Sequence, residues 1–168
     1  KFIGNCMTLL SKSAEIVQRA LCEKGLKLEV VDLNACTRTA NDAAMTIGCQ
    51  VEQIIKSLLF RTKETQKPVL VLASGKNRVS EKIIQKYIGE KIEKADADFT
   101  REITGFAIGG IPPIGHKNPI SLTYIDEDLL GYELLWAAAG TPYAVFSLPA
   151  KELQKVTGGK IISVKGVI

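Results

Sequence analysis

The segment from Gly105 to Gly115 carries the densest chemical signal in the sequence. It reads Gly-Phe-Ala-Ile-Gly-Gly-Ile-Pro-Pro-Ile-Gly. Gly109 and Gly110 can adopt backbone angles that other residues avoid, and they let a ligand approach bare amide groups. Pro112 and Pro113 fix φ at about −65° and remove two hydrogen-bond donors. The segment predicts a rigid loop that faces a substrate, with a tight surface connection as the alternative.

Lys56 is the second residue with a chemical signal, because it interrupts an apolar run. Residues 54–60 read Ile-Ile-Lys-Ser-Leu-Leu-Phe. An ammonium placed there must reach solvent or find a partner, since burying an unpaired charge is costly. The sequence therefore predicts either a contact between Lys56 and a phosphate or carboxylate, or an exposed lysine at a strand end.

Several enzyme classes lose support because their motifs are missing from the sequence. The patterns GxxxxGK[ST], GxGxxG, HExxH and GxSxG do not occur. The single histidine, His116, leaves little room for a Ser/His/Asp triad, and as a lone loop histidine it fits an ordinary surface role or a place beside the site. The four cysteines form no CxxC pair. We therefore expect neither a metal nor a cofactor.

The size and composition of the chain fit one globular domain. Its 168 residues are 46% hydrophobic and 24% charged, and a domain of this length buries roughly 70% of its unfolded surface. Isolated cysteines indicate a reducing compartment and no apolar run reaches the ~18 residues of a membrane span, so we expect a cytoplasmic protein with no membrane contact. The net charge of +4 and the lysine-rich region 56–94 permit a polyanionic partner, although solvated lysines would give the same pattern.

The elements that position these residues follow from apolar periodicity and from capping and turn residues. Helices are predicted over residues 14–22, 40–47, 80–87 and 96–103 and after Pro149 as a first helical residue, with Ser13, Thr39 and Ser80 as N-caps. Strands are predicted over residues 28–31, 56–62, 69–73, 121–125, 132–137 and 143–147, with 51–55 as one more helical turn and with 56–73 as a central hairpin. We expect an α/β or α+β domain whose mixed, mostly antiparallel sheet is packed by helices.

An ordered set of short motifs carries a family resemblance. The motifs are Thr37-Arg-Thr-Ala, Ala43-Ala44, Ile47-Gly48, the run 53–60 around Lys56-Ser57, the segment 104–115, Ile125-Asp126 and Ala139-Gly140. In this order the chain resembles the YbaK/EbsC family of aminoacyl-tRNA deacylases, whose fold also forms the editing domain inserted in bacterial prolyl-tRNA synthetases. The resemblance runs from about residue 13 to 156. It implies a single editing domain over 13–168, with 1–12 as an N-terminal extension.

The resemblance also implies the roles of individual residues. Lys56 matches the family's functional lysine, expected to hold the terminal adenosine and its phosphate, and Gly109 and Gly110 match the loop that offers N–H groups to the substrate carbonyl. Lys56, Gly109 and Gly110 are therefore the predicted catalytic residues. The predicted substrate-binding residues are Ser57, Ile111, Pro112, Pro113, Gly115, Asp126, Ala139 and Gly140. Asp126 fits a turn residue equally well.

The implied activity is trans-editing, the hydrolysis of the ester that joins a wrong amino acid to a tRNA. An aminoacyl ester is already activated, and family members are thought to use the substrate's own ribose hydroxyl to help activate water. The segment 137–145 is more apolar than in members specific for Cys-tRNA. Because an apolar wall discriminates one methylene by only ~1–3 kcal/mol, exclusion of larger residues is expected, with Ala, Ser, Thr or Cys as candidates.

Two other functions stay open at the level of sequence. A non-catalytic module could bind aminoacyl-tRNA ends or aminoacyl-adenosine ligands in the same pocket, and a hydrolase could act on small esters or thioesters unrelated to tRNA. The expected partner is the acylated 3′ end of tRNA, and an aminoacyl-tRNA synthetase is a further candidate.

Overall fold

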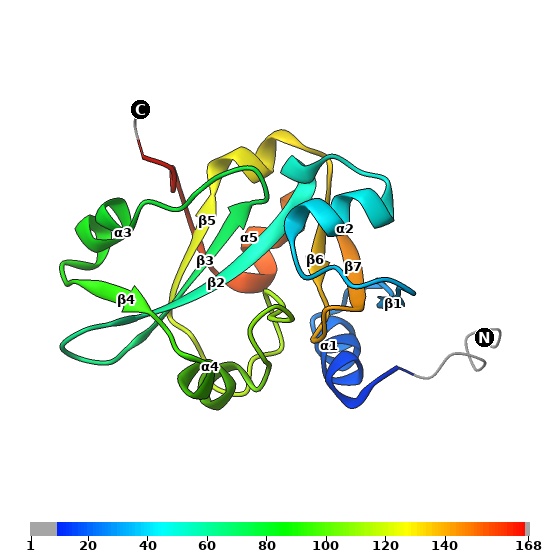
Figure 1. Ribbon diagram of the computed structural model, residues 1–168, viewed down its shortest axis with the longest axis horizontal. Helices are drawn as coiled ribbons and strands as arrows, with labels where there is room; N and C mark the ends of the chain where they lie inside the picture. The colour runs from blue at the N-terminus through cyan, green and yellow to red at the C-terminus, as the bar shows by residue number, and fades with distance from the viewer. Residues whose placement is uncertain (1–9, 167–168) are drawn as a thin grey trace.

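An eight-stranded mixed sheet organises the chain in the computed structural model, which describes residues 10–166 (Figure 1). The strands are β1 (Val31–Asp32), β2 (Ile54–Thr62), β3 (Pro68–Ser74), β4 (Ile92–Lys94), β5 (Leu122–Asp126), β6 (Leu134–Ala138), β7 (Ala144–Pro149) and β8 (Lys160–Ile162). They lie in the order β1-β7-β6-β2-β3-β5-β8, with β4 also paired to β2. Of the seven pairings among described residues, four are antiparallel and three are parallel. The mixed, mostly antiparallel sheet and its central β2–β3 hairpin are confirmed.

Five α-helices pack on this sheet within the described residues. They are α1 (Lys12–Glu23), α2 (Ala40–Ile47), α3 (Glu81–Ile88), α4 (Ala97–Thr104) and α5 (Ala150–Thr157). The first four begin at a Ser, Thr or Asp side chain that accepts an N–H of the first turn, and the last four end at a left-handed glycine.

Two predicted helix starts are wrong by a few residues. The N-cap of α1 is Ser11 rather than Ser13, so this helix begins at Lys12. Pro149 is the residue before α5, not its first helical residue. Most of the predicted N-terminal extension, residues 1–9, lies outside the described residues.

Local contacts explain where the predicted strands differ from the observed ones. The predicted strand 28–31 is reduced to β1, because the Gln18 side chain donates to the Leu28 carbonyl at 2.9 Å and accepts from Val30 N–H at 2.8 Å. Residues 51–53 form a short 3₁₀ helix, η2 (Val51–Gln53), and β2 then starts two residues earlier than predicted. A second 3₁₀ helix, η3 (Glu127–Gly131), precedes β6. The three-residue strands β4 and β8 carry too little periodicity to be predicted.

The sheet is interrupted beside β2 in a way that matters for function. One edge of β2 pairs with β3 along most of its length. The other edge pairs with β6 at residues 54–55 and with β4 at residues 60–62. Residues 56–58 lie between these two pairings without a strand partner on that edge, so the sheet opens next to Lys56.

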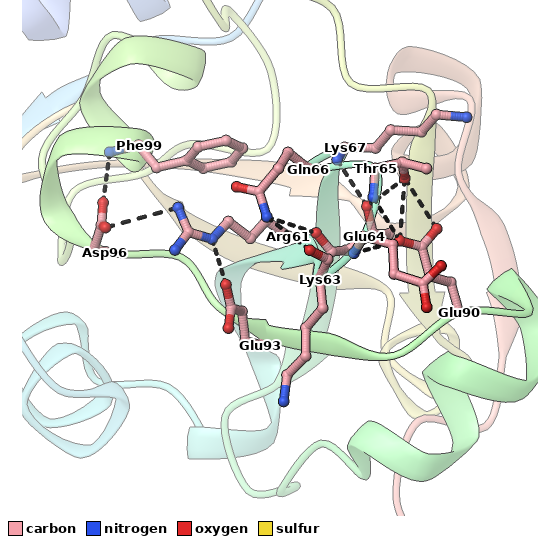
Figure 2. Close-up of polar contacts among 11 residues, drawn as sticks. Arg61, Lys63, Glu64, Thr65, Gln66, Lys67, Glu90, Glu93, Asp96 and Phe99 are labelled. Atoms are coloured by element: carbon pink, nitrogen blue, oxygen red, sulfur yellow. Dashed lines mark hydrogen bonds and ion pairs between the residues drawn. The ribbon is translucent and has the colours of Figure 1, made fainter.

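Arg61 ties the far side of this opening to the segment that carries the glycines and prolines (Figure 2). Its Nε donates to Glu93 Oε2 at 2.7 Å, and its guanidinium lies 3.8 Å from the Asp96 carboxylate. The same group lies over the Phe99 ring, 5.4 Å from the ring centroid. Because Asp96 caps α4, and α4 leads directly into Gly105, Arg61 helps to place the loop that follows.

Candidate active site

A pocket of about 440 Å³ opens at the interruption of the sheet. Its walls come from the segment before α2, from α2 itself, from the first half of β2, from the loop after α4, and from β6 and β7. The polar lining residues are Thr37, Arg38, Thr39, Asn41, Lys56 and Ser57. The pocket therefore brings Lys56 together with the segment 105–115, called the glycine loop below, as the sequence predicts.

Lys56 is half-buried in the pocket wall, and its ammonium donates to the main-chain carbonyl of Asn77. Burial lowers the pKa of Lys56, while the charge of Asp126 acts in the opposite direction. No ion pair among residues 10–166 includes Lys56. An ammonium carries three donors, so the group retains capacity to bind an anion in the pocket.

Asp126 supports Lys56 from behind and does not line the pocket. Its carboxylate is only 1% exposed and accepts from Ser74 N–H at 3.0 Å and from Asn77 Nδ2 at 2.8 Å. Asn77 also donates to Asp128 at 2.7 Å, so its side chain is held by two carboxylates. Asp126 thus fixes the Asn77 turn, and the Asn77 carbonyl in turn holds the Lys56 ammonium.

Ser57 presents an unsatisfied polar group at the same place. Its Oγ is buried and has no hydrogen-bond partner within the described residues, and the residue lines the pocket. A buried hydroxyl without a partner costs roughly 1–3 kcal/mol. Hydrogen bonding to a ligand in the pocket would remove that cost.

The glycine loop contributes Gly109 and Ile111 to the pocket, with Ile108 at its edge. Gly109 has φ +98°, a value that favours glycine, within a turn closed by the hydrogen bond from Gly110 N–H to the Ala107 carbonyl at 3.1 Å. Ile108 is 58% exposed.

Gly110 is buried and does not line the pocket. Its N–H belongs to the turn, and its carbonyl accepts from Gly140 N–H at 2.9 Å. A Cβ on Gly110 would lie 2.9 Å from the Gly140 carbonyl group, so the two glycines allow close backbone packing. The Gly110 amide is therefore engaged inside the protein, and among the two glycines only Gly109 faces the pocket.

The remaining predicted loop residues build the loop from inside. Pro112 and Pro113 are buried, and the Pro112 carbonyl accepts from His116 Nε2 at 2.7 Å. Burial lowers the pKa of His116, with that hydrogen bond acting in the opposite direction, and His116 does not line the pocket. Gly115, at φ +84°, packs against Ala20 of α1.

Ala139 and Gly140 lie just beyond the pocket wall. The pocket is lined by the two preceding residues of β6, Ala137 and Ala138. Ala139 is buried and bonded to β7, and a Cβ on Gly140 would lie 2.7 Å from the Ser13 carbonyl oxygen. The β6–β7 connection thus packs against the glycine loop and does not contact the pocket itself.

Several pocket residues are not among the predicted site residues. They are Thr37, Arg38, Thr39, Ala40, Asn41, Ala43, Ile47, Ile54, Ile55, Leu58, Gly75, Ile108, Trp136, Ala137, Ala138 and Val145. The motif Thr37-Arg-Thr-Ala was a usable signal, because it forms the start of α2 at the pocket. The sequence carries no signal that Asn77 belongs to the site, because its role rests on its hydrogen bonds with Lys56 and Asp126, which only the structure shows.

Comparison with known proteins gives a consistent result. The profile of the aminoacyl-tRNA editing domain matches residues 35–156. The chain is 29% identical over 133 residues to the uncharacterised protein YwhH of Bacillus subtilis (strain 168), covering 79% of this chain and 83% of that protein. It is 34% identical over 97 residues to the proline–tRNA ligase of Limosilactobacillus fermentum, covering 55% of this chain but 17% of the ligase.

A solved structure described as a proposed trans-editing enzyme for prolyl tRNA synthetase superposes with a TM-score of 0.89. It is 46% identical in sequence, and the match covers 95% of this chain and 100% of that one. Among residues 10–166, no helix combines the length and apolar character needed to cross a bilayer.

Proposed function

We propose that this chain, which belongs to the aminoacyl-tRNA editing domain family, hydrolyses the ester of a small amino acid wrongly attached to tRNA. The observation that carries the proposal is the pocket in the β2 opening, where Lys56, Ser57 and Gly109 share one space. A prolyl-tRNA synthetase is the candidate source of the mischarged tRNA, given the related structure. With such a substrate, we expect the activity to take place in the cytoplasm.

The apolar part of the pocket is the proposed site of the amino-acid side chain. It is lined by Ile47, Ile54, Ile111, Trp136, Ala137, Ala138 and Val145. These side chains offer contact area without charge, so a small residue fits by size and a larger one is excluded by steric overlap. Discrimination of this kind amounts to ~1–3 kcal/mol per methylene.

The polar part of the pocket is the proposed site of the ribose and the ester. Lys56 binds the terminal nucleotide through its phosphate, Ser57 Oγ hydrogen-bonds the ribose, and Gly109 N–H donates to the ester carbonyl. Water adds to the carbonyl carbon, the ester C–O bond breaks, and the proton passes to the departing ribose oxygen. The products are a free amino acid and a tRNA with a free terminal hydroxyl. A backbone donor aimed at the developing oxyanion contributes ~3 kcal/mol.

A panel of mischarged tRNAs tests the proposal directly. We expect wild-type protein to deacylate tRNA charged with one or more of Ala, Ser, Thr or Cys, and Lys56→Ala to lower kcat/KM by on the order of 10- to 100-fold, since a charge-assisted contact is lost. The matched control is Lys63→Ala, which changes an exposed lysine in the β2–β3 turn and should leave full activity. Undiminished turnover by Lys56→Ala would refute the assignment.

One observation favours a non-catalytic alternative. Among described residues, the pocket lining contains no carboxylate and no imidazole, and its one amine, Lys56, is assigned to phosphate binding, so the proposed reaction has no protein group as general base. A binding module would bind a non-hydrolysable aminoacyl-adenosine mimic tightly yet turn over no member of the tRNA panel. Trp136, the only tryptophan in the chain, lines the pocket and provides a fluorescence signal for that titration.

A further inference from the structure

We infer that Arg38, Lys76 and Arg78 form a cationic rim that binds backbone phosphates of the unpaired 3′ end of tRNA. The inference rests on the proposed function, because it takes the pocket as the place of the terminal nucleotide. It adds a second set of contacts outside the pocket, directed at the phosphates that precede that nucleotide.

The three cations belong to the pocket lining or to the chain segment next to it. Arg38 lines it directly. Lys76 follows Gly75, another lining residue, and Arg78 lies two positions further along the same turn. All three side chains are exposed, and none takes part in an ion pair among residues 10–166. The three charges are thus exposed and unpaired at ion-pair distance, with the Asp126 and Asp128 carboxylates held by Asn77 between two of them.

The charges of the pocket itself have the same sign. Arg38 and Lys56 are the charged residues of the described lining. Asp42 on α2 and Glu52 in η2 belong to bordering elements but do not line the pocket. A cleft lined by one sign of charge concentrates ligands of the opposite sign, so the site favours a polyanion.

The turn that carries two of these cations is held rigidly. Gly75 N–H donates to the Ile54 carbonyl at 2.8 Å, and Asn77 N–H donates to the Ser74 carbonyl at 2.9 Å. The Asn77 side chain is bonded to the buried Asp126 carboxylate. The backbone under Lys76 and Arg78 is therefore fixed relative to Lys56, which the same turn contacts through Asn77. Because the backbone is already fixed, binding costs mainly the conformational entropy of the two side chains.

A second cationic group in the chain provides a matched control. Lys63, Lys67 and Lys91 are also exposed and free of ion pairs in the described part of the chain. Lys63 and Lys67 lie in the β2–β3 turn (Figure 2). Lys91 precedes β4 beside this turn, and its carbonyl accepts from Lys63 N–H at 2.8 Å. Lys56 is the third residue of β2 (Ile54–Thr62), so the strand separates it from this turn by ~20 Å.

The test measures RNA binding against salt concentration. The probe is an RNA hairpin of the tRNA acceptor stem that carries no amino acid and keeps its unpaired 3′ end. The comparison probe is the same stem with a blunt end. Binding of each is measured by fluorescence anisotropy. Each neutralised phosphate of a single strand contributes a slope of ~0.7 in log K against log salt. We expect the triple variant R38Q/K76Q/R78Q to lower the slope by ~2 on the 3′-extended hairpin and to leave the blunt stem unchanged.

The control variant K63Q/K67Q/K91Q removes the same amount of charge. It should preserve the wild-type difference in slope between the 3′-extended hairpin and the blunt stem. An unchanged slope in the rim variant, or an equal loss on both RNAs, would overturn the inference. Since all six positions are exposed, both variants should keep the wild-type circular dichroism spectrum and Tm.

Kinetics separate failure of the inference from failure of the proposed function. Once a mischarged tRNA that the protein deacylates has been identified, the rim variant should raise KM at least tenfold with kcat within about twofold of wild type. The substitution Lys56→Ala should instead lower kcat/KM at every salt concentration. A drop in kcat with unchanged KM would contradict the rim. Absence of any turnover by wild-type protein would sink the proposed function, while the anisotropy result would still decide the rim.

Discussion

At the scale of single residues, the site depends on a lysine whose surroundings are set by a carboxylate it does not touch. Asp126 bonds Asn77, and the Asn77 carbonyl accepts from Lys56. The same carboxylate raises the pKa of Lys56 against the lowering effect of burial. Asp126 therefore acts as a positioning residue and as an electrostatic support for the protonated amine.

Replacement of Asp126 by Asn tests both roles through the pH dependence of activity. Removing the negative charge lowers the pKa of Lys56 further, so the active ammonium is lost at a lower pH. We expect the alkaline limb of kcat/KM to move to lower pH in Asp126→Asn, measured as initial deacylation rates corrected for spontaneous hydrolysis. The control Asp42→Asn changes an exposed carboxylate on α2 and should leave the limb in place. If the alkaline limb of the kcat/KM profile does not shift in Asp126→Asn, the carboxylate has no electrostatic effect on Lys56 that matters for activity.

At the scale of elements, the turn before the prolines places Gly109 at the pocket. Its φ of +98° is strained for any residue with a Cβ, although a Cβ there would meet no atom within 4 Å. The backbone conformation, rather than steric room, therefore requires glycine. Gly89, which ends α3 at φ +85°, has the same freedom from contacts.

The substitutions Gly109→Ala and Gly89→Ala compare equal backbone strain at two places. Each should destabilise the fold by about 1–2 kcal/mol, measured by urea unfolding. Only Gly109→Ala should also lower deacylation, because the turn must shift to relieve the strain and its N–H then leaves the ester carbonyl. Equal activity of the two variants would show that the Gly109 amide does not contribute to catalysis.

At the scale of the whole molecule, the pocket exists because β6 and β4 share one edge of β2 without meeting. Gly75 is where the surrounding parts come closest, since a Cβ there would lie 2.3 Å from the Val51 carbonyl oxygen and 2.9 Å from Ala40 Cβ. The end of β3, η2 and α2 are thus packed together through one glycine. Because Gly75 and Ala40 both line the pocket, this packing fixes that part of its wall.

The substitution Gly75→Ala should separate these elements. Overpacking of this kind typically costs ~1–3 kcal/mol, so we expect a lower Tm together with loss of deacylation as the Lys76–Arg78 turn and α2 move. Gly131→Ala is the control, because a Cβ at Gly131 meets nothing within 4 Å and the residue needs no left-handed backbone. Full activity and stability in Gly75→Ala would mean that the close contact relaxes without disturbing the site.

Much of the fold was predictable because it is encoded by local signals. Thr39, Ser80 and the glycines at 48 and 89 bound helices where the sequence predicts them. The central hairpin also follows from its apolar strands. Capping and periodicity act over a few residues, so they remain visible without the tertiary structure.

The sequence by itself determined the family resemblance, the mixed α/β architecture and the meeting of Lys56 with the glycine loop. Tertiary structure alone decided that Gly110 is engaged by Gly140, that Asp126 stands behind Lys56, and that Arg38 joins the turn at 76–78 around one opening. These arrangements depend on which edge of β2 each distant strand occupies. Strand pairing across many residues leaves no periodic trace in the chain, so only the folded molecule reveals it.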